Sequence, residues 1–164
     1  MRKNLISSLT NLLPPALKVG KCKPDIVVKV NAQPFPVWLK QLLWWNWPTK
    51  SGGVWPCYEI NSAKDILADE LFPQLVAASM VPIGSTINGD TLVIRFADES
   101  AEVGFVSHEE VYSAANISDV YAQVTPTLEE FLLRVNDRMF LPTDYWDAGE
   151  FSGLLREMRP SGGA

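Results

Sequence analysis

The chain has 164 residues, and 47% of them are hydrophobic, which is enough to bury the core of one domain. Its formal net charge of −5 argues against a phosphate-binding surface, so nucleic acid is not an expected partner. Polar residues interrupt the apolar stretch at the N-terminus, and no apolar run reaches the roughly 18 residues that cross a membrane. We therefore expect a cytoplasmic protein that has no membrane segment.

Positive and negative charges are distributed unevenly along the chain. Residues 1–64 contain nine Lys or Arg and two Asp or Glu, whereas residues 65–164 contain five Lys or Arg and seventeen Asp or Glu. Two interpretations are open. In the first, the two parts attract each other within one domain. In the second, the acidic part faces outward and attracts a basic partner.

The first part of the chain contains both helical and extended patterns. Apolar residues at helical spacing predict a short amphipathic helix that Pro14 ends; they are Leu5, Ile6, Leu9, Leu12 and Leu13. Residues 25–30 are predicted to form an edge strand, because Lys29 interrupts an otherwise apolar run.

A Trp-rich helix is predicted to begin at Pro36 and to end before Pro48. Its bulky side chains are too many for one face, so part of the helix is expected to be exposed. The tryptophans Trp44, Trp45 and Trp47 fit either core packing or stacking against a sugar or nucleobase.

A strand is predicted over residues 54–60, followed by a helix for which Ser62 is the N-cap and Asp65 stands at capping-box spacing. The apolar pattern continues to Val76, either as one helix or as two helices broken near Pro73.

The centre of the sequence predicts three antiparallel strands, which are residues 80–83, 91–96 and 102–106. Asn88 and Gly89 favour a turn between the first two, because both residues tolerate positive φ. With helices predicted on either side, the fold class is α+β, with a central antiparallel sheet packed against helices in a single domain.

Helical patterns return after the sheet. Residues 109–115 are predicted to form a helical turn, and Thr125 or Thr127 is expected to cap a helix. The apolar stripe of that helix consists of Leu128, Phe131, Leu132 and Val135. A last amphipathic helix is predicted over residues 145–158, with an apolar set of Trp146, Phe151, Leu154, Leu155 and Met158.

The side chains that enzymes and metal sites need are scarce. His108 is the only histidine, so neither a histidine pair for a metal nor a second catalytic histidine is available. Cys22 and Cys57 are too few for a structural zinc site, and free thiols in a reducing compartment are favoured over a disulfide. We expect no catalytic residues, no cofactor and no bound metal.

Several short motifs follow one another along the chain: VPIG at residues 81–84, Gly-Asp at residues 89–90, a strand that ends near a histidine, and LEEFL at residues 128–132. Their order resembles that of the SUKH superfamily of Smi/Knr-like proteins. The matching family positions are Pro82, Ile83, Gly84, Gly89, Asp90, His108, Glu130 and Phe131. The resemblance covers residues 35–135; residues 1–34 form an N-terminal extension with a basic connector, and residues 136–164 form a C-terminal helical extension expected to pack on the same domain.

The resemblance implies a non-catalytic protein-binding domain. Bacterial members of this type resemble immunity proteins that neutralise a polymorphic or contact-dependent toxin, commonly a nuclease or deaminase, by direct binding. Eukaryotic relatives act as scaffold or regulatory modules, which is the alternative function. A small-ligand or carbohydrate binder is a second alternative.

A basic toxin domain is the expected partner, because an acidic surface attracts such a domain. The residues expected to contact it are acidic or aromatic; they are Asp90, Asp98, Glu99, Glu102, Glu109, Glu110, Tyr112 and Trp55.

Overall fold

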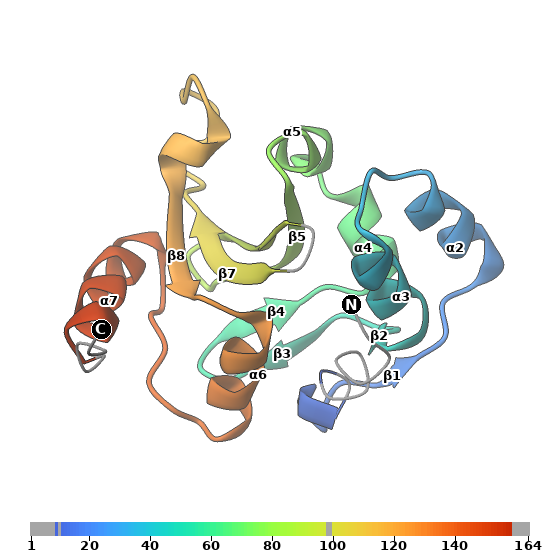
Figure 1. The fold of residues 1–164 in the computed structure, drawn as a ribbon, viewed down its shortest axis with the longest axis horizontal. Helices are drawn as coiled ribbons and strands as arrows, with labels where there is room; N and C mark the ends of the chain where they lie inside the picture. Colours follow the sequence, from blue (N-terminus) through green and yellow to red (C-terminus); the bar gives the residue numbers. More distant parts are fainter. Residues whose placement is uncertain (1–8, 10, 98–99, 159–164) are drawn as a thin grey trace, which may run out of the picture.

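A twisted, six-stranded antiparallel sheet forms the centre of the structure (Figure 1). The computed structural model describes residues 9, 11–97 and 100–158, with residues 152–158 described by their backbone alone. The strands lie side by side in chain order, and they are β3 (Gly52–Val54), β4 (Tyr58–Ile60), β5 (Met80–Ser85), β6 (Thr91–Phe96), β7 (Ala101–Val106) and β8 (Tyr121–Thr125). The predicted α+β class with a central antiparallel sheet is confirmed.

The predicted three-strand unit corresponds to β5, β6 and β7. Gly89 has a φ of 93°, and its amide donates to the carbonyl of Thr86 at 3.1 Å, which closes the turn between β5 and β6. Pro82 lies at a register shift in β5, where a strand tolerates the missing amide hydrogen. Gly84 is required for a different reason, since a Cβ there would lie 1.9 Å from the carbonyl oxygen of Glu59 in β4.

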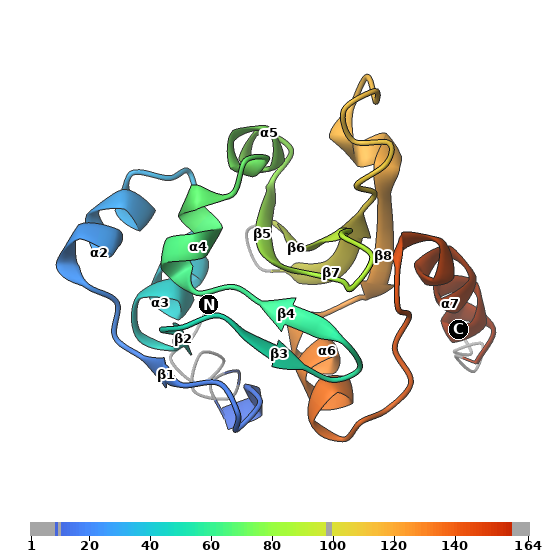
Figure 2. The ribbon, with the colours of Figure 1, turned by 180° about the vertical axis from the view of Figure 1, so that it is seen from behind.

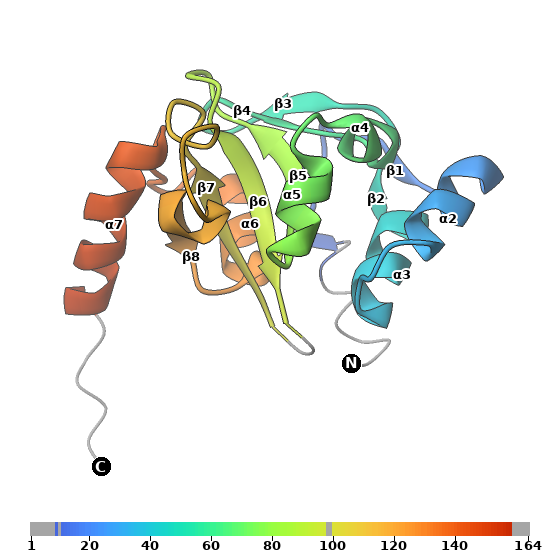
Figure 3. The ribbon, with the colours of Figure 1, turned by 90° about the horizontal axis from the view of Figure 1, so that it is seen from above.

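Both faces of the sheet carry buried apolar side chains. Alternate residues of β6 and β7, such as Ile94 and Phe105, point into a large core that includes α3 (Val37–Trp45), α4 (Ala63–Ala68) and α6 (Leu128–Asn136). The intervening residues, such as Val93 and Val106, point into a smaller core with Leu75 of α5 (Phe72–Ala77) and the segment of residues 107–120. Figure 3 shows α5 and α6 on opposite sides of the sheet.

The two ends of the chain pack on the same core, so the structure is one domain. Leu9 and Leu13 of the predicted first helix are buried there, whereas Leu5 and Ile6 lie outside the described residues. The last helix, α7 (Tyr145–Met158), has the predicted bounds and lies beside β8 at the edge of the sheet (Figures 1 and 2). Its Phe151 reaches the large core, and the side chains of Leu154, Leu155 and Met158 lie outside the described set.

Helix boundaries agree with the predictions where a local capping signal is present. Ser62 accepts a hydrogen bond from the amide of Asp65 at the start of α4, and Thr127 accepts one from the amide of Glu130 at the start of α6. Pro73 occupies the first turn of α5, so the residues 63–77 form two helices rather than one.

The predicted strand at residues 25–30 is wrong, because this segment lies in the helix α2 (Pro24–Asn31). Pro24 stands in the first turn, where its missing amide costs nothing. Ile26 and Val30 are the buried residues of the helix, and they are four positions apart on one helical face. Lys29 ends up on the exposed face, so it interrupts no strand.

The predicted strand at residues 54–60 is also wrong in part, since Trp55-Pro56 forms a turn between β3 and β4. The helical turn predicted over residues 109–115 corresponds to hydrogen-bonded turns over residues 108–113. The strands β1 (Val19–Gly20) and β2 (Trp47–Pro48), which pair with each other, and the strand β8 were not predicted. Cys22 and Cys57 are free thiols, as predicted, and both are half-buried. Among the described residues, no helix is long and apolar enough to cross a membrane.

Replacing Gly84 with Ala tests the contact between β4 and β5. The added methyl group meets the rigid backbone of Glu59, so we expect the free energy of unfolding to fall by about 2–4 kcal/mol in a denaturant melt. Gly53→Ala is the matched control, because its Cβ would lie 3.9 Å from the nearest atom, and we expect a change within about 0.5 kcal/mol. Equal stability of the two variants would contradict this account of Gly84.

Candidate functional site

The carboxylate of Asp90 joins three segments that are far apart in the sequence. One oxygen accepts from the backbone amide of His108 at 3.0 Å and lies 2.8 Å from the Nδ1 atom of the same residue. The other oxygen accepts from the backbone amide of Tyr145 at 2.8 Å. Asp90 therefore holds the β5–β6 turn, the end of β7 and the start of α7 together.

A second carboxylate strengthens the start of α7. Asp144 accepts from the amide of Asp147 at 2.9 Å, in the manner of an N-cap, and also accepts from the side chain of Asn88 at 3.1 Å. Because Asn88 belongs to the same turn as Asp90, the start of α7 is tied to this turn at two points. The first turn of α7 is thereby held beside β8.

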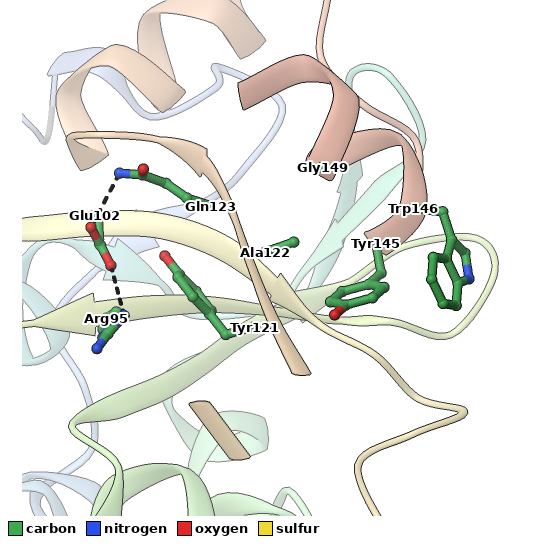
Figure 4. Close-up of a pocket in the computed structure, with 8 residues that line it drawn as sticks. All are labelled: Arg95, Glu102, Tyr121, Ala122, Gln123, Tyr145, Trp146 and Gly149. Atoms are coloured by element: carbon green, nitrogen blue, oxygen red, sulfur yellow. Dashed lines mark hydrogen bonds and ion pairs between the residues drawn. The ribbon is translucent and has the colours of Figure 1, made fainter. Parts of the chain in front are cut away.

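A hollow of about 580 Å³ lies between the first turns of α7 and the sheet (Figure 4). We call it the α7–β8 hollow, and it is lined by Arg95, Glu102, Tyr121, Ala122, Gln123, Tyr145, Trp146 and Gly149. The strands β6, β7 and β8 contribute its floor, and α7 contributes its outer wall.

Aromatic rings and one charged pair give the hollow its chemistry. The guanidinium of Arg95 lies 3.4 Å from a carboxylate oxygen of Glu102 and 5.3 Å from the ring centre of Tyr121. Gln123 donates to the other oxygen of Glu102 at 3.1 Å. Gly104 provides the space for the ring of Tyr121, because a Cβ at this position would lie 2.4 Å from it.

Both tyrosines of the hollow keep their protons at neutral pH. Burial, and then the negative charge of Glu102, raise the pKa of Tyr121. Burial also raises the pKa of Tyr145, and the negative charges of Glu110 and Asp90 raise it further. The rings are therefore neutral, and the Tyr145 end of the hollow is under a negative potential.

Four of the residues predicted to contact a partner lie in or near this part of the molecule. Glu102 lines the hollow, and Glu110 is close enough to act on Tyr145. Glu109 and Tyr112 are exposed on the segment that follows β7, with Tyr112 73% exposed.

The other predicted contact residues are placed differently. Asp90 is only 3% exposed and is fully engaged inside the protein, so its prediction as a surface contact is wrong. Trp55 lines a separate hollow near Pro14 and Arg138, and its indole donates to the carbonyl of Met139. Asp98 and Glu99 lie outside the described residues.

Most residues of the hollow are outside the set that the sequence predicts to contact a partner. The helical pattern places Trp146 in the apolar set of the last helix, but 59% of this residue is exposed. Arg95, Tyr121 and Gln123 were not selected, because their common orientation depends on the alternation of β6 and β8 and on the pairing of β8 with β7. The sequence signal was present in the alternating residues 121–125 and in the turn-forming residues Asn116, Ser118 and Asp119 before them.

The residues at the positions that resemble the family motifs take part in core packing, an ion pair and a hydrogen bond. Ile83 and Phe131 are fully buried, and the ring of Phe131 stacks on that of Tyr58 with the ring centres 5.9 Å apart. Glu130 forms an ion pair with Arg134 at 3.1 Å, one turn along α6. His108 is held by Asp90, as described above. No group of three or more His, Cys, Asp or Glu capable of holding a metal occurs in the described part of the chain.

The three tryptophans considered as a stacking platform do not form one. Trp47 is 1% exposed, and its indole donates to the carbonyl of Asn61 at 2.8 Å. Trp44 is half-buried, and only Trp45 has an exposed ring, above which Lys21 lies at 4.4 Å from the ring centre. A ligand that stacks on several rings would find one ring here.

The elements that carry most of the lysines and the elements around the α7–β8 hollow lie at opposite ends of the ribbon (Figures 1 and 2). The basic end extends from β1 to the start of α4 and carries Lys18, Lys21, Lys23, Lys29, Lys40, Lys50 and Lys64. The acidic end surrounds the α7–β8 hollow and carries Glu102, Glu109, Glu110, Asp119, Asp144, Asp147 and Glu150. Within the described ranges, no ion pair joins the two ends. Four acids of this end are exposed, namely Glu109, Asp119, Asp147 and Glu150.

Replacing Asp90 with Asn tests its role in holding α7. The side chain of asparagine has one acceptor oxygen, so it cannot accept from all of these donors. We therefore expect the free energy of unfolding to fall by about 2–4 kcal/mol and the hydrogen exchange of the backbone amides in α7 to accelerate. Asp119→Asn is the control, because Asp119 is exposed and a change within about 0.5 kcal/mol is expected. Wild-type stability and exchange in the Asp90→Asn variant would show that the carboxylate has no such role.

Three comparisons with known proteins provide no assignment: no protein-family model matches the chain, and neither does any curated protein or any solved structure.

Proposed function

We propose that this chain is a non-catalytic, cytoplasmic protein-binding domain of the immunity type, which neutralises a basic toxin domain by direct binding. The observation that carries the proposal is the acidic end. From Ala101 to Glu150 the sequence has ten Asp or Glu, two Arg and no Lys; of these acids Glu102 lines the aromatic-walled hollow, and Asp147 and Glu150 are exposed on α7, which forms its outer wall.

Charge complementarity supports this choice of partner. Nuclease domains carry positive surfaces that hold phosphate groups, and an acidic surface captures them rapidly over long range. An immunity protein benefits from rapid capture, because the toxin acts as long as it is free. Charged rims mainly set the rate of association, whereas buried aromatic anchors slow dissociation.

The composition of the hollow supports binding to a protein. Tyrosine, tryptophan and arginine are the residues that most often dominate the binding energy of interfaces. Trp146, Tyr145 and Arg95 line the hollow together, and Asp147 and Glu150 are exposed on the helix that carries the two aromatic residues. The same arrangement would serve a regulatory scaffold module, and the identity of the partner separates the two functions.

A tagged pull-down from the native cells, followed by mass spectrometry, tests the proposal. We expect one stoichiometric partner with a basic toxin domain, recovered more efficiently at low salt than at moderate salt. Recovery of several unrelated cellular proteins would instead favour the scaffold module.

Charge reversal tests the part played by the acidic end. The double variant Glu109→Lys, Glu150→Lys is expected to lower the rate of association with the captured partner by about tenfold at low salt, and the effect should shrink as salt is added. The matched control is Lys23→Glu, Lys29→Glu, which changes two exposed charges at the basic end and is expected not to slow association. Equal slowing by both variants would contradict a specific role for the acidic end.

A further inference from the structure

We infer that the α7–β8 hollow receives an arginine side chain of the protein partner, between Tyr145, Trp146 and the neighbouring carboxylates. This inference rests on the proposed function and names the group that the hollow recognises. The guest guanidinium would lie against aromatic ring faces while its N–H groups point toward acceptors on the rim.

The outer part of the hollow has the walls that such a guest requires. The rings of Tyr145 and Trp146 meet edge to face with their centres 5.1 Å apart, and 59% of Trp146 is exposed. Figure 4 shows the rings of Tyr121, Tyr145 and Trp146 following one another along the hollow, away from Glu102. The faces of such rings attract cations, and the attraction increases where water is partly excluded.

The inner part of the hollow already contains an arrangement of this kind. The guanidinium of Arg95 lies over Tyr121, and Glu102 holds it there. The cation–ring contacts within the described residues involve Trp45, Tyr121 and Phe151, and none involves Tyr145 or Trp146. The inner ring is thus occupied by the protein's own arginine, and no cation from the described residues lies over the two outer rings.

The surrounding charge favours a positive guest. Glu110 and Asp90 act electrostatically on Tyr145, and Asp147 and Glu150 are exposed on the same helix. Repulsion from Arg95 is reduced because Glu102 neutralises it. An arginine suits the site better than a lysine, because a planar guanidinium stacks on a ring and still donates hydrogen bonds from its edge.

An NMR titration with a blocked Gly-Arg-Gly peptide tests the inference without the partner. We expect chemical-shift changes at the indole N–H of Trp146 and at the amides of Tyr121 and Tyr145. The same peptide with citrulline in place of arginine keeps the shape of the side chain and removes its charge. We expect this peptide to bind at least about tenfold more weakly in the same titration. Equal changes with both peptides, or no changes in the hollow, would overturn the inference.

Two exposed tryptophans provide matched variants. Trp146→Leu removes the outer ring and is expected to abolish the arginine-dependent shifts, whereas Trp45→Leu, at the basic end, is expected to leave them unchanged. Because both side chains are more than half exposed, both variants should keep the spectrum of the folded protein elsewhere. Arginine-dependent shifts that persist in Trp146→Leu would place the cation outside the hollow.

The same variants separate this inference from the proposed function. If a basic toxin domain is captured and Trp146→Leu binds it with unchanged affinity, the inference of an arginine site is wrong and the proposed function stands. If the peptide shifts the signals of the hollow and no basic partner is captured, the arginine site stands and the proposed partner is wrong. If both are correct, we expect Trp146→Leu to weaken partner binding at least about tenfold.

Discussion

The buried carboxylate of Asp90 makes the interactions on which the arrangement of the acidic end depends. A carboxylate removed from water is costly unless donors surround it, and here the donors come from the end of β7 and from the start of α7. The backbone amide of Tyr145 is one of the first amides of a helix, which has no partner within the helix itself. Burial of Asp90 and placement of α7 are therefore coupled, and the side chains that α7 presents to β8 follow from this coupling.

The sheet itself leaves little room for a binding site. Its central strands are covered on both faces, because β6 and β7 direct apolar residues both toward α6 and toward α5. Polar and aromatic side chains gather on the face near β8, beyond the end of the smaller core. There Arg95, Glu102 and Gln123 satisfy one another, and Gly104 leaves space for the ring of Tyr121. The helix α7 then turns this edge of the sheet into a hollow.

The uneven distribution of charge gives the molecule a basic end and an acidic end. Lysines gather at the end formed by β1, α2 and α4, and carboxylates gather around α7 and the segment after β7. Since no ion pair connects the two ends within the described residues, little of this charge is cancelled internally. An approaching basic protein would be oriented by such a field before contact. The acidic end and the hollow within it thus fit one binding event. In this event a basic partner is first attracted over long range and then makes contact in the aromatic-lined hollow.

The amino-acid sequence by itself determined the elements whose signals are local. The caps at Ser62 and Thr127, the turn at Gly89 and the alternation of β6 each depend on residues a few positions apart, and the structure has all of them. The segment of residues 25–30, with four apolar residues out of six, fits either a strand or a helix until Pro24 and the burial of Ile26 and Val30 are considered together. The α7–β8 hollow was decided only by the tertiary structure. Its residues come from segments up to 54 positions apart, between Arg95 and Gly149, and they meet because strand pairing and the Asp90 carboxylate bring these segments together.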